Sequence, residues 1–210
     1  MRVTGLGRGL SAALEQWRVP RAVHDLGTIV ADLAAAVALG GDCLADIAVL
    51  REQPCLAGPV ASDPVVSRLV KTLAGDLPRA LEAVRAARAA ARERAWALAG
   101  QNAPGADGGL VTIDLDATIV IAHSERRSRP PRPGRRASAH TLLAYSDNTG
   151  EPLAGMLRKG SAGSNTASDH LAVLDAAIAA LPPAYGRRLM VTADGAGPRL
   201  SCPGSPRARS

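Results

Sequence analysis

The stretch 111–118, with the sequence VTIDLDAT, decides the fold class of this 210-residue chain. Its apolar residues alternate with Thr and Asp, and successive side chains of a strand point to opposite faces of a sheet. One face therefore carries Asp114 and Asp116, and the other face is apolar. A second apolar run over 189–194, LMVTAD, also ends in a carboxylate. The two runs predict strands that deliver Asp116 and Asp194.

The sequence around these runs predicts a mixed sheet. After a Gly/Ala/Asp linker over 101–109, the hydrophobic period changes from that of a helix to that of a strand. We expect strands over 110–122, 139–146, 152–159 and 188–193, with an amphipathic helix over 168–181. The helical crossover lets the fourth strand lie parallel to the first, which places Asp194 near Asp116. The order β-β-β-α-β opens the ribonuclease-H-like fold, so we predict an α+β chain with an incomplete domain of that fold.

Residues 10–100 have the pattern of a helical domain. Leu10, Leu14 and Trp17 lie at helical spacing. Thr28 and Asp42 are expected to cap two helices, because Thr and Asp side chains accept hydrogen bonds from the first free backbone N–H groups.

Two further helices are expected in this region. The sequence Ser62-Asp63-Pro64 is a start signal for a helix over 64–74, and Asp76 with Pro78 opens an Ala/Arg-rich helix that ends at Ala99. The inward residues of the 64–74 helix are expected to be Val65, Val66, Leu69, Val70 and Leu73. The arginines of the long helix, Arg85, Arg88, Arg92 and Arg94, are interpreted as a solvated face.

Composition favours an anionic partner. The net charge is +6 and the isoelectric point is about 10.0, which suits nucleic acid. A GC-rich genome is the alternative, since it enriches Ala, Arg, Gly and Pro without any partner. Cys43, Cys55 and Cys202 have no C-x-x-C spacing and are expected to be reduced thiols. No apolar stretch is long enough to span a bilayer and no signal-peptide layout is present. We therefore expect a cytoplasmic protein without a membrane partner.

Two carboxylates on neighbouring strands are suited to Mg²⁺, which prefers oxygen ligands and takes one or two carboxylates plus substrate phosphates. On the pattern alone, a solvated strand edge explains Asp114 and Asp116 equally well, and a turn explains Asp194. We expect His123 and His140 to be structural, and His170 to be an exposed helix residue.

Short sequence blocks agree in order with one known family over residues 10–197. These blocks are GGDCLADIAVLR at 40–51, GPVASDP at 58–64, IDLDAT at 113–118, DNTGE at 147–151, GSNTA at 163–167 and ADGAG at 193–197. The chain resembles the DDE transposases of bacterial insertion sequences, in a group common in actinobacteria. The resemblance implies Mg²⁺-dependent DNA cleavage and strand transfer, with transposon-end DNA as the partner. Self-association of the chain is a further expectation.

The resemblance also implies the site residues. Asp116 and Asp194 are the first two catalytic acids and metal ligands, and Asp116 is preferred because it begins the Asp-Ala-Thr step. Asp114 is the alternative first acid and a third candidate ligand. The family's third acid has no counterpart, since residues 195–210 contain no Asp or Glu. We therefore expect a truncated, inactive fragment with an internal start and a disordered, out-of-frame tail over 198–210. A non-catalytic DNA-binding protein is the alternative.

Two regions are candidates for DNA binding. The segment 126–136 replaces a Gly/Phe-containing stretch of the family, and its candidate residues are Arg126, Arg127, Arg129, Arg132, Arg135 and Arg136. The 64–74 helix, with Arg68 and Lys71, is a candidate reading helix of a helix-turn-helix. A disordered basic loop and a plain amphipathic helix are the respective alternatives. The expected organisation is a helical, candidate DNA-binding region over 1–100, the linker 101–109, a partial catalytic domain over 110–197, and the tail.

Overall fold

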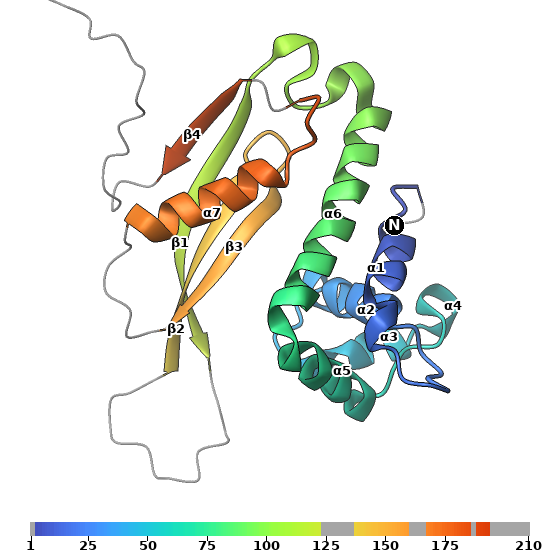
Figure 1. The fold of residues 1–210 in the computed structure, drawn as a ribbon. Coiled ribbons are helices and arrows are strands. Elements are labelled where there is room, and N and C mark those ends of the chain that lie inside the picture. Colours follow the sequence, from blue (N-terminus) through green and yellow to red (C-terminus); the bar gives the residue numbers. More distant parts are fainter. Residues whose placement is uncertain (1–2, 123–136, 160–166, 186–187, 194–210) are drawn as a thin grey trace, which may run out of the picture. The chain divides into compact units, whose positions relative to one another are not determined.

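The computed structural model describes residues 3–122, 137–159, 167–185 and 188–193. The chain divides into two compact units, residues 1–100 and residues 101–210. The first is a helical unit and the second is built on a sheet (Figure 1). Each unit is described by itself below.

The helical unit contains the helices that the sequence predicts, with shorter elements between them. In chain order these are α1 Leu6–Leu14, η1 Glu15–Trp17, α2 Leu26–Ala38, η2 Leu44–Ile47, α3 Ala48–Arg51, α4 Pro54–Ala57, α5 Asp63–Gly75 and α6 Leu77–Ala99. Short 3₁₀ turns, η3 Gly100–Asn102 and η4 Ala106–Gly108, then lead into the sheet. The linker that we expected over 101–109 therefore has local helical turns.

The starts of α2 and η2 correct two predicted caps. Asp25, not Thr28, caps α2: the backbone N–H of Thr28 donates to Asp25 Oδ1 at 2.7 Å. Asp25 has extended backbone angles and so stands outside the helix, whereas Thr28 lies in its first turn. Asp42 does not cap η2 either, since Cys43 occupies that position and Asp46 supplies the carboxylate.

Two apolar clusters hold the helical unit together. Ile29, Ile47 and Val66 belong to the larger cluster, which joins α2, η2 and α5. The smaller cluster is formed by Leu10, Ala31 and Ala87 and joins α1, α2 and α6. Removing such side chains from water is the main force that stabilises the unit.

Two side chains of the helical unit differ from prediction. Val70, expected inside, is 41% exposed. Arg92, expected on a solvated face, is 5% exposed and lies among the buried residues of α6, with Ala91 and Trp96. An Ala/Arg-rich helix has no strong apolar stripe, so its sequence does not reveal which face turns inward.

The sheet has four strands in the order β3-β2-β1-β4. Its strands are β1 Val111–Ala122, β2 Ala137–Ser146, β3 Glu151–Lys159 and β4 Leu189–Ala193. β1 pairs antiparallel with β2, β2 antiparallel with β3, and β1 parallel with β4. The parallel pair is reached through α7 Ala167–Ala179, as the crossover predicts. The chain is therefore α+β, as expected.

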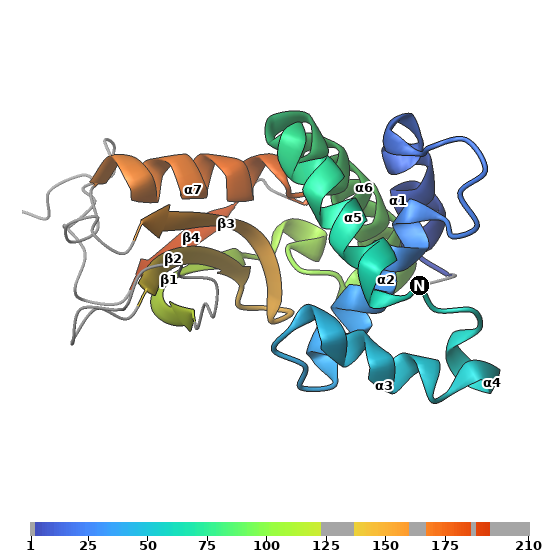
Figure 2. The same cartoon turned by 90° about the horizontal axis from the view of Figure 1, so that it is seen from below.

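Helix α7 packs on one face of the sheet, against β3, β2 and β1 (Figure 2). Alternate residues of β1, including Ile113 and Leu115, are buried and lie on the same face as the buried Leu142 and Ala144 of β2. Beside the helix, Arg158 of β3 forms a 2.9 Å ion pair with Asp169, and the Arg158 side chain is 8% exposed.

The buried face of α7 is only partly the one that its large apolar residues suggest. The buried residues are His170, Val173 and Ala177, whereas Leu171 is 47% and Ile178 is 41% exposed. The expected exposed position of His170 is therefore wrong, since this side chain is 4% exposed. The buried residues His170, Val173 and Ala177 recur at the helical spacing and form one face of α7. This face is rotated by about one residue from the face that the leucines suggest.

Candidate metal centre

The register of β1 and β4 defines the candidate site. Asp114 lies opposite Thr192, and Leu115 lies opposite Ala193. Leu115 and Ala193 are the residues directly before Asp116 and Asp194. Asp194 itself lies outside the described residues, so its role as a catalytic acid stays a prediction. The structure does bring together the two strand segments that lead to these carboxylates.

Asp114 and Asp116 share a face because side chains alternate along β1. Asp116 is partly buried, and Ile113 and Leu115 occupy the opposite, α7-covered face. Thr141 of β2 pairs with Thr118 of β1 and with Leu157 of β3, so Leu157 lies on the same face of the sheet as the carboxylates. Leu157 is 73% exposed. Helix α7 packs on the other face of the sheet and leaves the face with the carboxylates uncovered.

Asp114 has a direct partner on the neighbouring strand. The Thr192 hydroxyl donates a hydrogen bond to Asp114 Oδ1 at 2.8 Å. This cross-strand bond orients the Asp114 carboxylate toward β4 and joins the two parallel strands one residue before Ala193. Sequence analysis missed Thr192, because its pairing with Asp114 depends on the register of two segments far apart in the chain.

A turn fixes the start of β1. The Asn148 side chain accepts a hydrogen bond from the Thr112 backbone N–H at 2.8 Å and donates one to the Leu110 carbonyl at 3.3 Å. Gly150, at the last position of this turn, has a φ of 67°, which glycine adopts without steric cost. The strand that carries the two carboxylates is thus anchored at its first residues.

The donor atoms at this site suit a hard cation. Asp114 and Asp116 offer carboxylate oxygens and Thr192 offers a hydroxyl, and oxygen is the ligand type that Mg²⁺ prefers. The three side chains lie on the same open face. The residues present therefore fit a divalent metal of this type, and Asp116 directly follows Leu115, which pairs with the last residue of β4.

The predicted DNA-binding residues fall into two groups. Arg68 and Lys71 are exposed on α5, as a DNA-contacting helix requires. The basic segment, with Arg126, Arg127, Arg129, Arg132, Arg135 and Arg136, lies outside the described residues. His123 also lies outside them, as does the side chain of His140.

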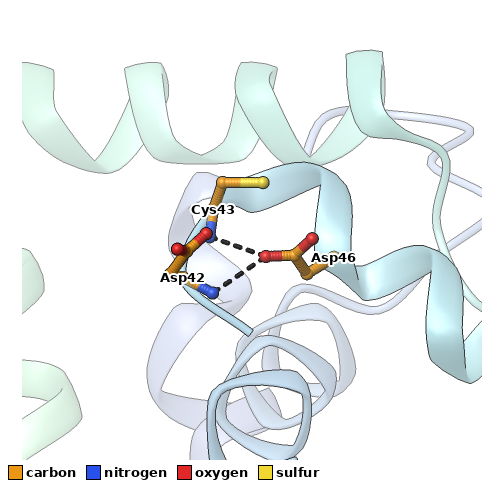
Figure 3. A group of neighbouring side chains, drawn as sticks. All are labelled: Asp42, Cys43 and Asp46. Atoms are coloured by element: carbon orange, nitrogen blue, oxygen red, sulfur yellow. Dashed lines mark hydrogen bonds between the residues drawn. The ribbon is translucent and has the colours of Figure 1, made fainter. Parts of the chain in front are cut away.

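A second acidic group lies in the helical unit, where sequence analysis predicted no site. Asp42, Cys43 and Asp46 place one ligand atom each within 4.8 Å of one another (Figure 3). Asp46 Oδ2 accepts hydrogen bonds from the backbone N–H groups of Asp42 and Cys43, at 2.8 Å each. These backbone hydrogen bonds hold the pKa of Asp46 below its ordinary value. The arrangement is the capping box of η2, with Cys43 as the cap residue and Asp46 three positions later. An acidic residue at that spacing is the sequence signal that could have predicted it.

A comparison with protein families decides the identity of the chain. The family model for the transposase DDE domain, group 1, matches residues 1–201. The chain belongs to this family. No curated protein and no solved structure matches it. Membership of this transposase family implies DNA as the partner and a divalent metal as the cofactor. Among the helices of the described residues, none is long and apolar enough to cross a membrane.

Proposed function

We propose that the chain carries the metal-binding strands of an insertion-sequence transposase, in which Asp116 and Asp194 hold Mg²⁺ for DNA cleavage and strand transfer. Family membership supports the reaction class. The parallel register, with Leu115 opposite Ala193, supports the pairing of these two acids. The β-β-β-α-β order supports a ribonuclease-H-like catalytic domain over 110–197, and the sequence blocks support the actinobacterial group.

The choice between the two β1 carboxylates rests on their positions relative to the end of β4. Because Asp114 Oδ1 accepts the Thr192 hydroxyl at 2.8 Å, Asp114 serves to join the strands. Asp116 lies two residues further along β1, next to the point where β4 leads into Asp194. We therefore assign the first catalytic acid to Asp116 and a supporting position to Asp114.

The proposed chemistry uses the strands as a rigid holder. A bound divalent cation lowers the pKa of the attacking water and neutralises charge on the phosphate in the transition state. Strand β1 holds the Asp116 carboxylate on the open face of the sheet. The Thr192–Asp114 hydrogen bond keeps β4 in a fixed register with β1. On the opposite face, the buried residues of β1 and β2 lie beneath α7, which keeps β1 in place.

Metal binding tests this proposal directly. Isothermal titration of the purified chain with Mn²⁺ should show binding that Asp116→Asn weakens by at least about tenfold, because a charged ligand is lost. Asp175→Asn is the matched control: it makes the same charge change at an exposed position of α7. Equal Mn²⁺ affinity in Asp116→Asn and Asp175→Asn would contradict the proposed site.

We propose further that this 210-residue chain binds DNA and metal without completing strand transfer alone. The resemblance implies a third carboxylate, and residues 195–210 supply neither Asp nor Glu. A DNA-nicking assay with Mg²⁺ or Mn²⁺ checks this point. Nicking that is present in the chain and absent from Asp116→Ala would show that two carboxylates are sufficient.

DNA binding without catalysis is the second candidate function, and the net charge of +6 with the exposed Arg68 and Lys71 favours it. Each phosphate contact contributes about 0.9 to the slope of log affinity against log salt. Deleting residues 126–136 should therefore flatten this slope. An unchanged slope would place the phosphate contacts elsewhere, with Arg68 and Lys71 as the next residues to test.

A further inference from the structure

The helical unit contains a cavity that the proposed metal centre does not use. Its volume is about 380 Å³, within the range of about 300–1,000 Å³ found for small-molecule pockets. The cavity is lined by Trp17, by the loop that follows it, and by residues of α2 and α5. Ile29 and Leu69 also line it and are 1% and 4% exposed. Both belong to the larger apolar cluster of the helical unit, so the cavity borders the core.

The ionisable side chains that line this cavity are basic. Arg21, His24 and Arg68 line it, and of the described lining residues none is acidic. The neighbouring carboxylate of Asp25 is engaged elsewhere, since it accepts hydrogen bonds from Ser11 Oγ at 2.6 Å and from the Thr28 N–H at 2.7 Å. A cavity with an apolar interior and a cationic rim is complementary to a ligand that has an apolar ring and an anionic group.

We propose that this cavity binds one unstacked base of DNA, with the adjoining phosphate at Arg68 and Arg21. The interior offers Trp17 as an aromatic surface, and bases stack on aromatic side chains in proteins that bind single strands. Guanidinium groups bind phosphate through charge-assisted hydrogen bonds. The family acts on DNA, so DNA is the anionic polymer that meets this surface. The inference goes beyond the metal centre, because it assigns a separate site on separate residues.

Helix α5 offers a matched pair of basic residues. Substituting each one distinguishes DNA binding in the cavity from nonspecific binding of the DNA backbone. Arg68 lines the cavity, whereas Lys71, three residues later on the same helix, does not. Both side chains are exposed, so neither substitution disturbs the core. Loss of Lys71 should weaken binding of any DNA backbone. Loss of Arg68 should mainly weaken binding of a strand whose base enters the cavity, because only such a strand brings the adjoining phosphate to Arg68.

The experiment uses the full chain and two fluorescently labelled single strands, a short oligothymidylate and the same backbone without bases. Fluorescence anisotropy should show that the chain binds the base-bearing strand about tenfold more tightly, as expected for stacking of one base. Arg68→Ala and Trp17→Leu should reduce this preference to less than about threefold, on the same reasoning. Lys71→Ala should lower both affinities and leave their ratio unchanged.

Tryptophan emission gives a second measurement on the unmodified chain. The unlabelled oligothymidylate should quench Trp17, and the quenching should disappear in Trp17→Leu, in which the remaining Trp96 is 4% exposed. Equal affinity of the chain for the two strands would overturn the proposal. Quenching by a short acidic, leucine-rich peptide but not by the oligothymidylate would also overturn it, since the cavity would then bind protein. Asp116→Asn should keep the preference for the base-bearing strand and lose Mn²⁺ binding. The cavity proposal and the metal-centre proposal can therefore be refuted separately.

Discussion

The carboxylates of the helical unit and those of the sheet unit are used differently. In the helical unit, Asp25 and Asp46 accept backbone N–H groups at helix starts, and Asp63 pairs with Arg51 at 2.8 Å. In the sheet unit, Asp114 and Asp116 stand on an open face, and Asp114 bonds to a hydroxyl of another strand. Aspartate therefore caps helices in the helical unit, whereas in the sheet unit it lies on the strand face that α7 leaves uncovered.

The largest expected effect tests whether the two units are stabilised separately. Ile113 in β1 and Ile47 in η2 are both fully buried. Truncation of either to alanine should cost roughly 2–5 kcal/mol. Differential scanning calorimetry of Ile113→Ala should lower the transition of the sheet unit alone, and Ile47→Ala that of the helical unit alone. A single transition that shifts equally in both variants would show that the units unfold together.

A smaller effect is expected at the ion pair that joins α3 to the start of α5. Arg51 donates to the Ala61 carbonyl at 2.9 Å and to Asp63 Oδ1 at 2.8 Å. The two side chains are 31% and 48% exposed, so solvent screening keeps the contribution near 1 kcal/mol. Arg51→Ala should show this loss in urea unfolding of the helical unit. Arg51→Lys, which keeps the charge without the paired N–H groups, should recover only part of it.

The next effect concerns the cross-strand bond of the metal centre. Thr192→Val removes the hydroxyl at nearly the same volume and should cost the sheet unit about 0.5–1 kcal/mol. Its Mn²⁺ affinity should fall less than that of Asp116→Asn, and Thr192→Ser should restore it. If Asp114→Asn lowered the Mn²⁺ affinity more than Asp116→Asn does, Asp114 would be the first catalytic acid and our assignment would be wrong.

The smallest effect depends on pH. Burial raises the pKa of Asp32 on α2, with partial compensation by His24, and Asp32 Oδ2 is buried without a hydrogen-bond partner. A carboxyl group whose pKa is higher in the folded state favours folding when protonated, and this contribution is lost as the pH rises through that pKa. Asp32→Asn should therefore raise the melting temperature at pH 7 more than at pH 3. Glu82→Gln, on an exposed position of α6, is the control and should show no such difference.

The sequence predicts the strands better than it predicts the orientation of the helices. The alternation in 111–118 gives β1 and its carboxylate face, because a period of two allows only two faces. In α7, leucines and a histidine compete for the inward positions, and the packing against β3 places His170 inside and Leu171 outside. At α2, Asp25 and Thr28 are both suitable caps, and only the backbone angles of Asp25 decide between them.

The candidate site follows from the sequence in part. The carboxylate pattern predicts Asp114 and Asp116, and the crossover predicts that β4 is parallel to β1. The contact between Thr192 and Asp114 could not be predicted, since it needs the register of strands separated by 78 positions. The cavity beside Trp17 was also missed, because part of its lining comes from a loop without a hydrophobic period.

The register of β1 with β4 also limits how the coding sequence can change in length. Side chains of a strand alternate, so the gain or loss of one codon exchanges the faces of all residues that follow. Loss of the codon for Met190 would set Ala193 opposite Asp114 and turn the Thr192 hydroxyl toward the apolar face. A change of two codons would preserve the faces and shift only the pairing. Within β4, in-frame length variants of odd size should therefore be lost from functional copies, while substitutions are tolerated more often.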